Sequence, residues 1–213
     1  MGKPADLAKE QRRALDRLKA VQGIERFYLA RGSAVAVHLH HRRSLDLDLF
    51  SLSPDEDLSA MSERLRAVLP DLKVLGLTEA SLRILAAGVP VDFVRYPYSP
   101  LHPPETGRVA IPVAGLEDLA AMKLAAVARR GLKRDFWDLH AIAESGMTLR
   151  DMANAYLAKF GAAEADLYHV LRALTYFDDA EREAGYPSGL SQRKWEQIKA
   201  FFRNEAPALL SDR

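Results

Sequence analysis

The stretch RGSAVAVHLHHRRSLDLDLF, residues 31–50, carries the strongest indication of the fold. It begins with the pair Gly32-Ser33, continues through an apolar run of about two helical turns, and ends in Asp46 and Asp48, which alternate with leucines. A strand precedes it at 27–30. The pattern predicts a strand, a turn, a helix over 34–40 and a second strand that carries both aspartates.

The two aspartates are expected to lie on one face of that strand. Side chains alternate across a strand, so Asp46 and Asp48 share a face with Cα atoms about 7 Å apart, while Leu45, Leu47 and Leu49 enter the core. Paired carboxylates of this kind can hold one or two Mg²⁺ ions, as nucleotidyl transfer requires. The same alternation also describes an ordinary strand with one solvated face.

A third carboxylate, Asp92, lies in the middle of the apolar strand VPVDFV, with no cationic residue immediately beside it in sequence. An unpaired buried carboxylate is costly, so Asp92 needs a metal ion, an arginine or solvent. If its strand lies beside the strand of Asp46 and Asp48, the three form a triad.

Gly32-Ser33 is a candidate phosphate-binding turn. Glycine permits close backbone approach, and the N-terminus of the following helix offers free N–H groups and a positive dipole end. Ser33 then either caps the helix or contacts a phosphate. An ordinary N-terminal cap has the same appearance.

The rest of the chain separates into a mixed part and a helical part. The segment 96–104 contains four prolines and is taken as the boundary, with a core at 1–100 and a mainly helical part at 101–213. The remaining predicted helices cover 6–21, 53–69, 116–130, 133–145, 148–160, 163–177 and 191–204, and the remaining strands cover 72–77, 81–87 and 91–96.

Composition is compatible with several functions and excludes a few. The 213 residues are 48% hydrophobic, which is enough for a substantial core, and the absence of cysteine excludes a disulfide scaffold or a cysteine-based metal site. No long apolar run or signal peptide is present, so we expect a cytoplasmic protein without membrane contact. The net charge of +1 leaves nucleic-acid binding to local patches, such as Arg193, Lys194, Lys199 and Arg203, which otherwise form a solvated helix edge.

Other phosphate and metal sites fit less well. There is no G-x-x-x-x-G-K-[ST] and no G-x-G-x-x-G motif after a strand. His38 and His41 have the spacing of a helical zinc pair, but no third soft ligand is near them in sequence. The neighbouring Arg43 is a candidate contact for a nucleotide or RNA phosphate.

Taken together, Gly32-Ser33, the run at 43–50 and the run from Lys123 to Leu139 resemble the AbiEii/AbiGii-type nucleotidyltransferase toxins, a branch of the DNA polymerase β-like superfamily. The resemblance covers about residues 25–145. It implies an α+β fold, a polymerase β-like core with a small mixed sheet flanked by helices and a helical C-terminal part. It also implies transfer of a nucleotide from an NTP to an acceptor, with Mg²⁺ or Mn²⁺, in some relatives to the 3′ end of tRNA, and a possible antitoxin partner.

The resemblance also assigns roles to single residues. It makes Gly32 and Ser33 the phosphate-binding turn, Asp46 and Asp48 metal ligands, Asp92 the third acid, and Lys123 and Asp135 further polar residues near the site, with Lys123 on the β- and γ-phosphates. One departure is Arg31, which precedes Gly32, whereas many relatives have a second glycine or a threonine around the turn.

Several alternatives stay open at this point. Lys123 lies in an apolar helical neighbourhood and can also reach solvent by extending its side chain. Asp135 can also serve the helix dipole and surface ion pairs. The acceptor can also be a small molecule or a protein hydroxyl, and a catalytically silent nucleotide- or RNA-binding protein of the same fold is the rival from another class.

Overall fold

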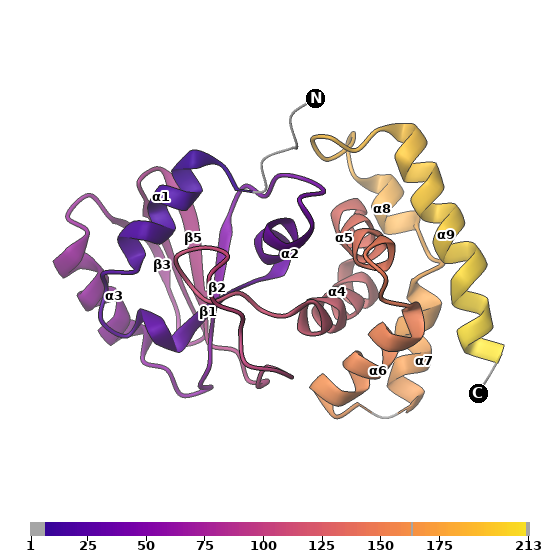
Figure 1. Ribbon diagram of the computed structural model, residues 1–213, viewed down its shortest axis with the longest axis horizontal. Coiled ribbons are helices and arrows are strands. Elements are labelled where there is room, and N and C mark those ends of the chain that lie inside the picture. Colours follow the sequence, from indigo (N-terminus) through magenta and orange to yellow (C-terminus); the bar gives the residue numbers. More distant parts are fainter. Residues whose placement is uncertain (1–6, 163, 212–213) are drawn as a thin grey trace. The chain divides into compact units, whose positions relative to one another are not determined.

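The computed structural model describes residues 7–162 and 164–211, and the chain forms two compact units, Met1–Gly115 and Leu116–Arg213 (Figure 1). We call them unit 1 and unit 2 and describe each by itself. The division falls later than residue 100, because the segment after the prolines stays on the sheet of unit 1. There the Leu29 N–H donates to the Pro112 carbonyl at 2.8 Å, and the Ala114 N–H donates to the Leu29 carbonyl at 2.9 Å.

Unit 1 is built on a five-stranded mixed sheet with the strand order β1-β2-β5-β4-β3. Strands β2 and β5 are parallel, and the other neighbours are antiparallel. The bounds are β1 (Phe27–Ala30), β2 (Leu47–Ser51), β3 (Lys73–Leu77), β4 (Ser81–Ala86) and β5 (Val89–Val94).

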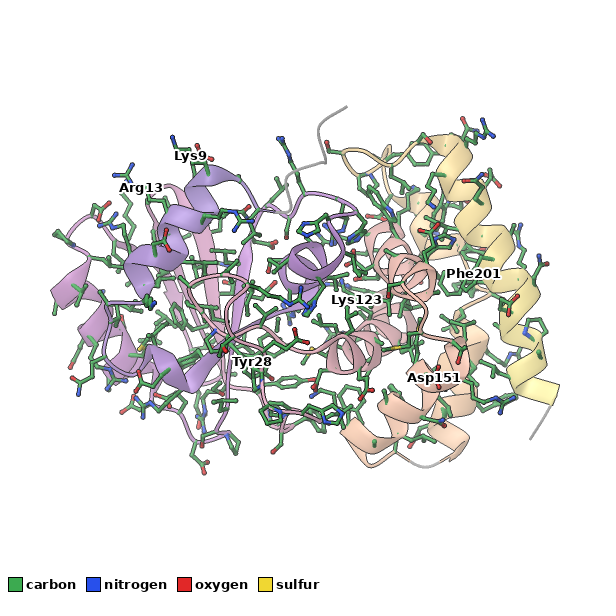
Figure 2. The ribbon with its side chains drawn as sticks, viewed as in Figure 1. Lys9, Arg13, Tyr28, Lys123, Asp151 and Phe201 are labelled. Carbon is green, nitrogen blue, oxygen red and sulfur yellow. The ribbon has the colours of Figure 1, made fainter. Side chains whose placement is uncertain are left out.

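The helices of unit 1 follow from amphipathic patterning. Their bounds are α1 (Lys9–Leu18), α2 (Arg31–Leu39) and α3 (Leu58–Val68), with a 3₁₀ turn at Ile24–Arg26. Helix α1 buries Leu15 and Leu18 and exposes Lys9 and Arg13 (Figure 2). The predicted start of this helix at residue 6 lies outside the described residues. Helix α3 begins later than predicted, because Asp57 caps it by accepting hydrogen bonds from the N–H groups of its first turn.

The hydrophobic core of unit 1 lies between the sheet and its helices. Phe27 of β1 meets Phe93 of β5 edge to face, with ring centroids 5.1 Å apart. Leu29, Leu49 and Val91 are fully buried in the same core. The alternating apolar positions of β1, β2 and β5 therefore pack as the sequence predicts.

Unit 2 contains helices joined by turns and loops, and no strand among its described residues. Its helices are α4 (Leu116–Arg130), α5 (Lys133–Glu144), α6 (Leu149–Phe160), α7 (Glu164–Ala173), α8 (Asp178–Arg182) and α9 (Gln192–Ser211). Phe136 of α5 packs against Phe177, Trp195 and Phe202, with centroid separations of 5.0 to 5.8 Å. This aromatic cluster explains why α9 carries the apolar residues Trp195 and Phe202 on one face.

Three helices of unit 2 differ from the prediction, and one of them is α9, which continues to Ser211 instead of ending at residue 204. The expected helix over 163–177 ends at Ala173, and the short helix α8 follows it; residue 163 lies outside the described part. Helix α8 is held by the buried Lys133, whose ammonium donates to the Ala180 carbonyl at 2.7 Å. That long-range contact has no signature in the local sequence.

The predicted class, an α+β chain with a small mixed sheet flanked by helices and a helical C-terminal part, is confirmed. Among the described residues, no helix has the length and apolar character needed to span a bilayer.

Candidate active site

Four strands of unit 1 bring the candidate residues into one row across the sheet. Ala30 of β1 pairs with Asp48 of β2, Asp48 pairs with Asp92 of β5, and Asp92 pairs with Arg83 of β4. Register partners on neighbouring strands direct their side chains to the same face. The strand carrying Asp92 therefore lies beside the strand carrying Asp48, as the formation of a triad requires.

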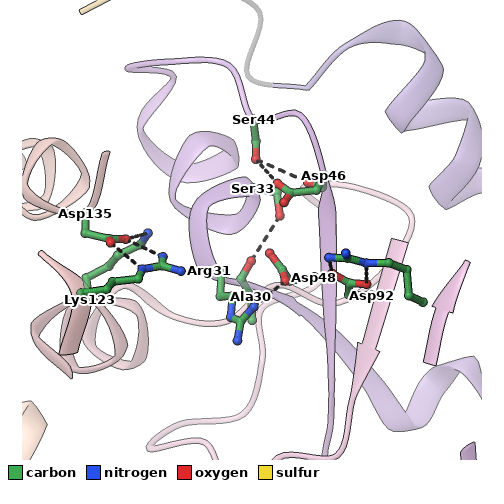
Figure 3. A network of polar contacts seen from close by, with 11 residues as sticks. Ala30, Arg31, Ser33, Ser44, Asp46, Asp48, Asp92, Lys123 and Asp135 are labelled. Carbon is green, nitrogen blue, oxygen red and sulfur yellow. Dashed lines mark hydrogen bonds and ion pairs between the residues drawn. The ribbon is translucent and has the colours of Figure 1, made fainter. Parts of the chain in front are cut away.

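Arg31 and Arg83 each contact one of the two central acids of this row (Figure 3). An Arg31 guanidinium N–H donates to Asp48 Oδ1 at 3.0 Å. Arg83 donates through two nitrogens to both oxygens of Asp92, at 2.7 and 2.6 Å. We call Asp46, Asp48 and Asp92, with Arg31 and Arg83, the acid row.

Asp48 is the most enclosed acid of the row, with 8% of its side chain exposed. Burial raises the pKa of Asp48 to about 6, because desolvation disfavours the charged form; Arg31 opposes this shift, while Asp46 and Asp92 add to it. The three carboxylates are therefore close enough to influence one another. A strongly perturbed carboxyl beside two others is typical of a functional site.

Asp46 lies just outside the strand, which differs from the prediction. Strand β2 begins at Leu47, and the Ser44 hydroxyl contacts both the Asp46 carbonyl and Asp46 Oδ1 at 3.4 Å (Figure 3). The prediction that Leu45 enters the core is wrong, because its side chain is 86% exposed. The bend before β2 breaks the alternation that placed Leu45 on the core face.

The Gly-Ser pair lies inside the first turn of α2, and not in a turn before it. Helix α2 begins at Arg31, and Ala30 is its N-cap residue. Ser33 is buried and donates its hydroxyl to the Ala30 carbonyl at 3.2 Å, so it does not cap the helix. Among the described residues no side chain caps this end. Because Ala30 pairs with Asp48, the N-terminus of α2 lies next to the acid row.

The basic run at residues 38–43 supplies few free contacts for a phosphate or a metal ion. Arg43 is exposed, and its carbonyl accepts a hydrogen bond from Arg42. His38 is tied to the Ala114 carbonyl at 2.8 Å. Burial lowers the pKa of His38, and the hydrogen bond to Ala114 opposes that shift. His38 therefore has a structural partner of its own.

Lys123 and Asp135 belong to a closed cluster in unit 2. Lys123 Nζ lies 2.9 Å from Asp135 Oδ1 and 2.7 Å from Asp138 Oδ2. Arg130 donates to both oxygens of Asp135, at 2.8 and 2.9 Å (Figure 3). We call Lys123, Arg130, Asp135 and Asp138 the buried network.

Charges in the buried network balance, with two cations and two anions. Desolvation opposes the ionisation of Asp135, but the charges of Lys123 and Arg130 and their hydrogen bonds outweigh it and lower the pKa of Asp135. Both aspartates are fully buried, whereas 35% of the Arg130 side chain is exposed. The network holds α4 against α5, since each helix supplies one sign of charge.

Two of the four basic residues on the edge of α9 are paired with carboxylates. Lys194 pairs with Glu144 at 2.9 Å and Lys199 pairs with Glu181 at 2.6 Å. Arg203 lies over the ring of Phe177, 5.2 Å from its centroid. These contacts give most of this edge a structural role within unit 2.

Within residues 7–162 and 164–211, no group of three or more histidine, aspartate or glutamate side chains is arranged so that it could hold a metal ion. The guanidinium groups of Arg31 and Arg83 are bonded to the oxygens of Asp48 and Asp92 that a cation would use. The carboxylate oxygens of Asp46, Asp48 and Asp92 are donors of the kind that a hard divalent cation prefers, and a cation could bind Asp48 and Asp92 only after Arg31 and Arg83 release those oxygens.

Arg83 is a residue of the acid row that the sequence motifs do not single out, although the turn before β5 indicates its position. Ala87 and Gly88, both with positive φ, form the two-residue turn between β4 and β5. A two-residue hairpin turn fixes the register of its strands, so counting outward from the turn pairs Arg83 with Asp92. The prediction placed the connection at Gly88-Val89-Pro90, which hides this pairing.

Comparisons with known proteins agree with the geometry. The family model described as nucleotidyl transferase AbiEii toxin, type IV toxin–antitoxin system, matches residues 13–211. An uncharacterized protein of Aquifex aeolicus (strain VF5) is 32% identical over 209 residues, covering 97% of this chain and 98% of that protein. The solved structure of MenT4, a nucleotidyltransferase toxin from Mycobacterium tuberculosis H37Rv, has a similar fold. Its TM-score is 0.50 at 17% identity, over 92% of this chain and 81% of MenT4.

Proposed function

Because this chain belongs to the AbiEii family of nucleotidyl transferase toxins of type IV toxin–antitoxin systems, we propose that it transfers a nucleotide from an NTP to an acceptor hydroxyl at the acid row. The 3′ end of tRNA is the proposed acceptor. The observation that carries the proposal is the register Ala30–Asp48–Asp92, which sets the N-terminus of α2 beside two carboxylates.

The proposed reaction depends on a divalent cation, Mg²⁺ or Mn²⁺, held by Asp46, Asp48 and Asp92. The register supports this, since Asp48 and Asp92 are direct partners on β2 and β5, and a cation would offset the repulsion between their carboxylates. When bound, the ion supplies charge neutralisation for the phosphates and activation of the attacking oxygen.

The residues of unit 1 bind the triphosphate and take up a proton in this proposal. Backbone N–H groups at Gly32 and Ser33 face the phosphates at the N-terminus of α2. The acceptor oxygen forms a bond to the α-phosphorus, the bond to the β-phosphate oxygen breaks, and pyrophosphate leaves. Asp92, with 15% of its side chain exposed against 8% for Asp48, is the candidate base for the proton of the acceptor hydroxyl.

Lys123, Asp135 and Arg43 stay predictions as contacts of the nucleotide. The two carboxylate partners of Lys123 support a structural role for it within unit 2. An antitoxin partner follows from the family description and belongs to the same proposal. Because NTPs and tRNA are cytoplasmic, the proposed place of action is the cytoplasm.

The test is a labelling reaction with each of the four α-³²P-NTPs, Mg²⁺ and total RNA, resolved on a denaturing gel. We expect label on a tRNA-sized band with the wild-type chain and none with Asp46→Asn/Asp48→Asn. Asp71→Asn is the matched control, since Asp71 is an exposed acid of unit 1 that pairs with Arg17 outside the acid row. It should label like the wild type.

Other outcomes separate the alternatives. Equal labelling by wild type and the double variant contradicts the site. No labelled RNA, with NTP binding lost in the double variant, contradicts tRNA as the acceptor and directs the search to small molecules and proteins. RNA binding without transfer of any NTP contradicts the enzymatic proposal and favours a silent binding protein.

A further inference from the structure

Arg31 has a backbone conformation that its residue type disfavours. Its φ is 53°, in the left-handed region that glycine adopts freely and a residue with a Cβ adopts at a cost. It is the first residue of α2, immediately before Gly32. Non-glycine residues held in this region cluster at functional sites, so the side chain of Arg31 is the feature to explain.

The side chain of Arg31 makes two contacts in the acid row. One N–H donates to Asp48 Oδ1 at 3.0 Å, and the guanidinium lies 5.1 Å from the centroid of the Phe50 ring. Phe50 is two residues after Asp48 on β2, so it lies on the same face of the strand. The strained backbone conformation of Arg31 therefore occurs together with a guanidinium that contacts Asp48 and Phe50.

The contact with Asp48 uses fewer hydrogen bonds than the other ion pair of the row. Arg31 is 43% exposed and donates one of its five N–H groups to one oxygen of Asp48, whereas Arg83 donates to both oxygens of Asp92. Most donors of Arg31 therefore remain available to an incoming anion. Guanidinium is well suited to phosphate, because its planar fork donates two parallel hydrogen bonds.

The position of Arg31 in the chain places it where a phosphate would bind. Arg31 is the first residue of α2, and the N-cap residue Ala30 pairs with Asp48. A phosphate at this helix end would meet backbone N–H groups from one side and the Arg31 guanidinium from the other.

We propose that Arg31 is a nucleotide-binding residue whose guanidinium rests on Asp48 in the nucleotide-free chain and moves to the triphosphate when an NTP binds. This inference rests on the proposed function, because it takes the acid row as the nucleotide site. This role of Arg31 predicts a result that a purely structural ion pair would not give. Arg31 competes with a divalent cation for Asp48 but assists the nucleotide, so its removal should lower the affinity for the nucleotide without lowering the affinity for the cation.

The test uses Arg31→Gly in the full chain, because glycine fits the left-handed backbone and the variant is expected to fold. Mn²⁺ alone is titrated and its free fraction is followed by electron paramagnetic resonance. The affinity for each α-³²P-NTP with Mg²⁺ is measured by equilibrium dialysis. We expect NTP affinity to fall tenfold or more, and Mn²⁺ affinity to stay equal or rise.

Two further variants make the test specific. Arg31→Lys should recover part of the NTP affinity, because it restores the charge without the planar fork. Arg17→Gln removes an arginine from an ion pair with Asp71 on the same unit and should change neither affinity.

The outcomes separate this inference from the proposed function. If Arg31→Gly binds NTP as the wild type does, the inference is wrong, and labelling by the wild type still supports the function. If Mn²⁺ and NTP affinities fall together, Arg31 only supports Asp48 and the inference is wrong. If the wild-type chain itself binds no NTP, the proposed function fails and the inference fails with it.

Discussion

The acid row of unit 1 and the buried network of unit 2 use the same kinds of side chain and differ in how far they are closed. In the buried network Lys123 contacts two fully buried aspartates, and the charges balance among its four members. In the acid row the arginine partners are more exposed, 43% for Arg31 and 59% for Arg83 against 35% for Arg130. A closed network holds helices together, whereas an open one can exchange its partners for a ligand.

The energetics of the two clusters differ for the same reason. Breaking a buried ion pair leaves an uncompensated charge in a region of low dielectric, which is strongly destabilising. Exposed pairs contribute little, because water and salt compensate for their loss. The comparison therefore predicts large stability effects in unit 2 and mainly functional effects in unit 1.

The largest stability effect is expected for Lys123→Met. The substitution leaves Asp138 without its ammonium partner and Asp135 with Arg130 alone, so unit 2 should lose about 3–5 kcal/mol. Urea unfolding followed by tryptophan fluorescence measures this directly, because both tryptophans of the chain, Trp137 and Trp195, lie in unit 2.

Lys194→Met is the matched control for Lys123→Met. Lys194 pairs with Glu144 at an exposed position of the same unit, so the same substitution there should cost no more than about 1 kcal/mol. Equal losses for the two variants would show that the buried network is no more structural than a surface pair.

A smaller effect of opposite sign is expected for Asp48→Asn. The pKa of Asp48 rises from 3.8 to about 6 on folding, so the folded chain binds more protons in this range, and stability is lost as pH rises through it. Removing the carboxylate should therefore stabilise unit 1 by about 1–3 kcal/mol above pH 7.

The stabilisation by Asp48→Asn should also depend on pH in a defined way. It should disappear below about pH 3, where the wild-type carboxyl is protonated in both states. Hydrogen exchange of peptides from β2 and β5 measures it within unit 1. A pH-independent difference would assign the effect to packing instead of charge.

The smallest effect is expected for the stability of Arg31→Gly. Relief of the left-handed backbone is worth about 1–2 kcal/mol, and it is offset by the greater chain entropy of glycine and by the loss of a half-exposed ion pair. The net change in unit 1 should stay within about 1 kcal/mol. A loss of several kcal/mol by hydrogen exchange would show that Arg31 is a structural residue like Lys123.

Local patterns predicted most of the elements. The helix over 116–130 was predicted with its observed bounds, because Gly115 and Gly131 flank a continuous helical pattern. The three later strands of unit 1 were placed within two residues at their ends, because strand periodicity is a local property. The predicted triad required the strands of Asp48 and Asp92 to be neighbours in the sheet. The parallel pairing of β2 with β5 meets this condition.

The partners of the charged residues were harder to predict. The partners of Lys123 depend on the packing of α4 against α5, which local periodicity does not encode. The contact of Arg31 with Asp48 depends on the left-handed backbone conformation of Arg31. Sequence rules expect glycine in that conformation, so they do not predict it for an arginine. The pairing of Arg83 with Asp92 was accessible from the two-residue turn at Ala87 and Gly88 and needed only the correct position of that turn.

The central claim is that the acid row is open because it is a catalytic site, and Asp48→Asn tests it most directly. One preparation of this variant is assayed for hydrogen exchange in β2 and for transfer of label from α-³²P-NTP to RNA at pH 8, beside the wild type. The account predicts a more stable unit 1 and no detectable transfer. Transfer at the wild-type rate by this variant would contradict the account, whatever its stability.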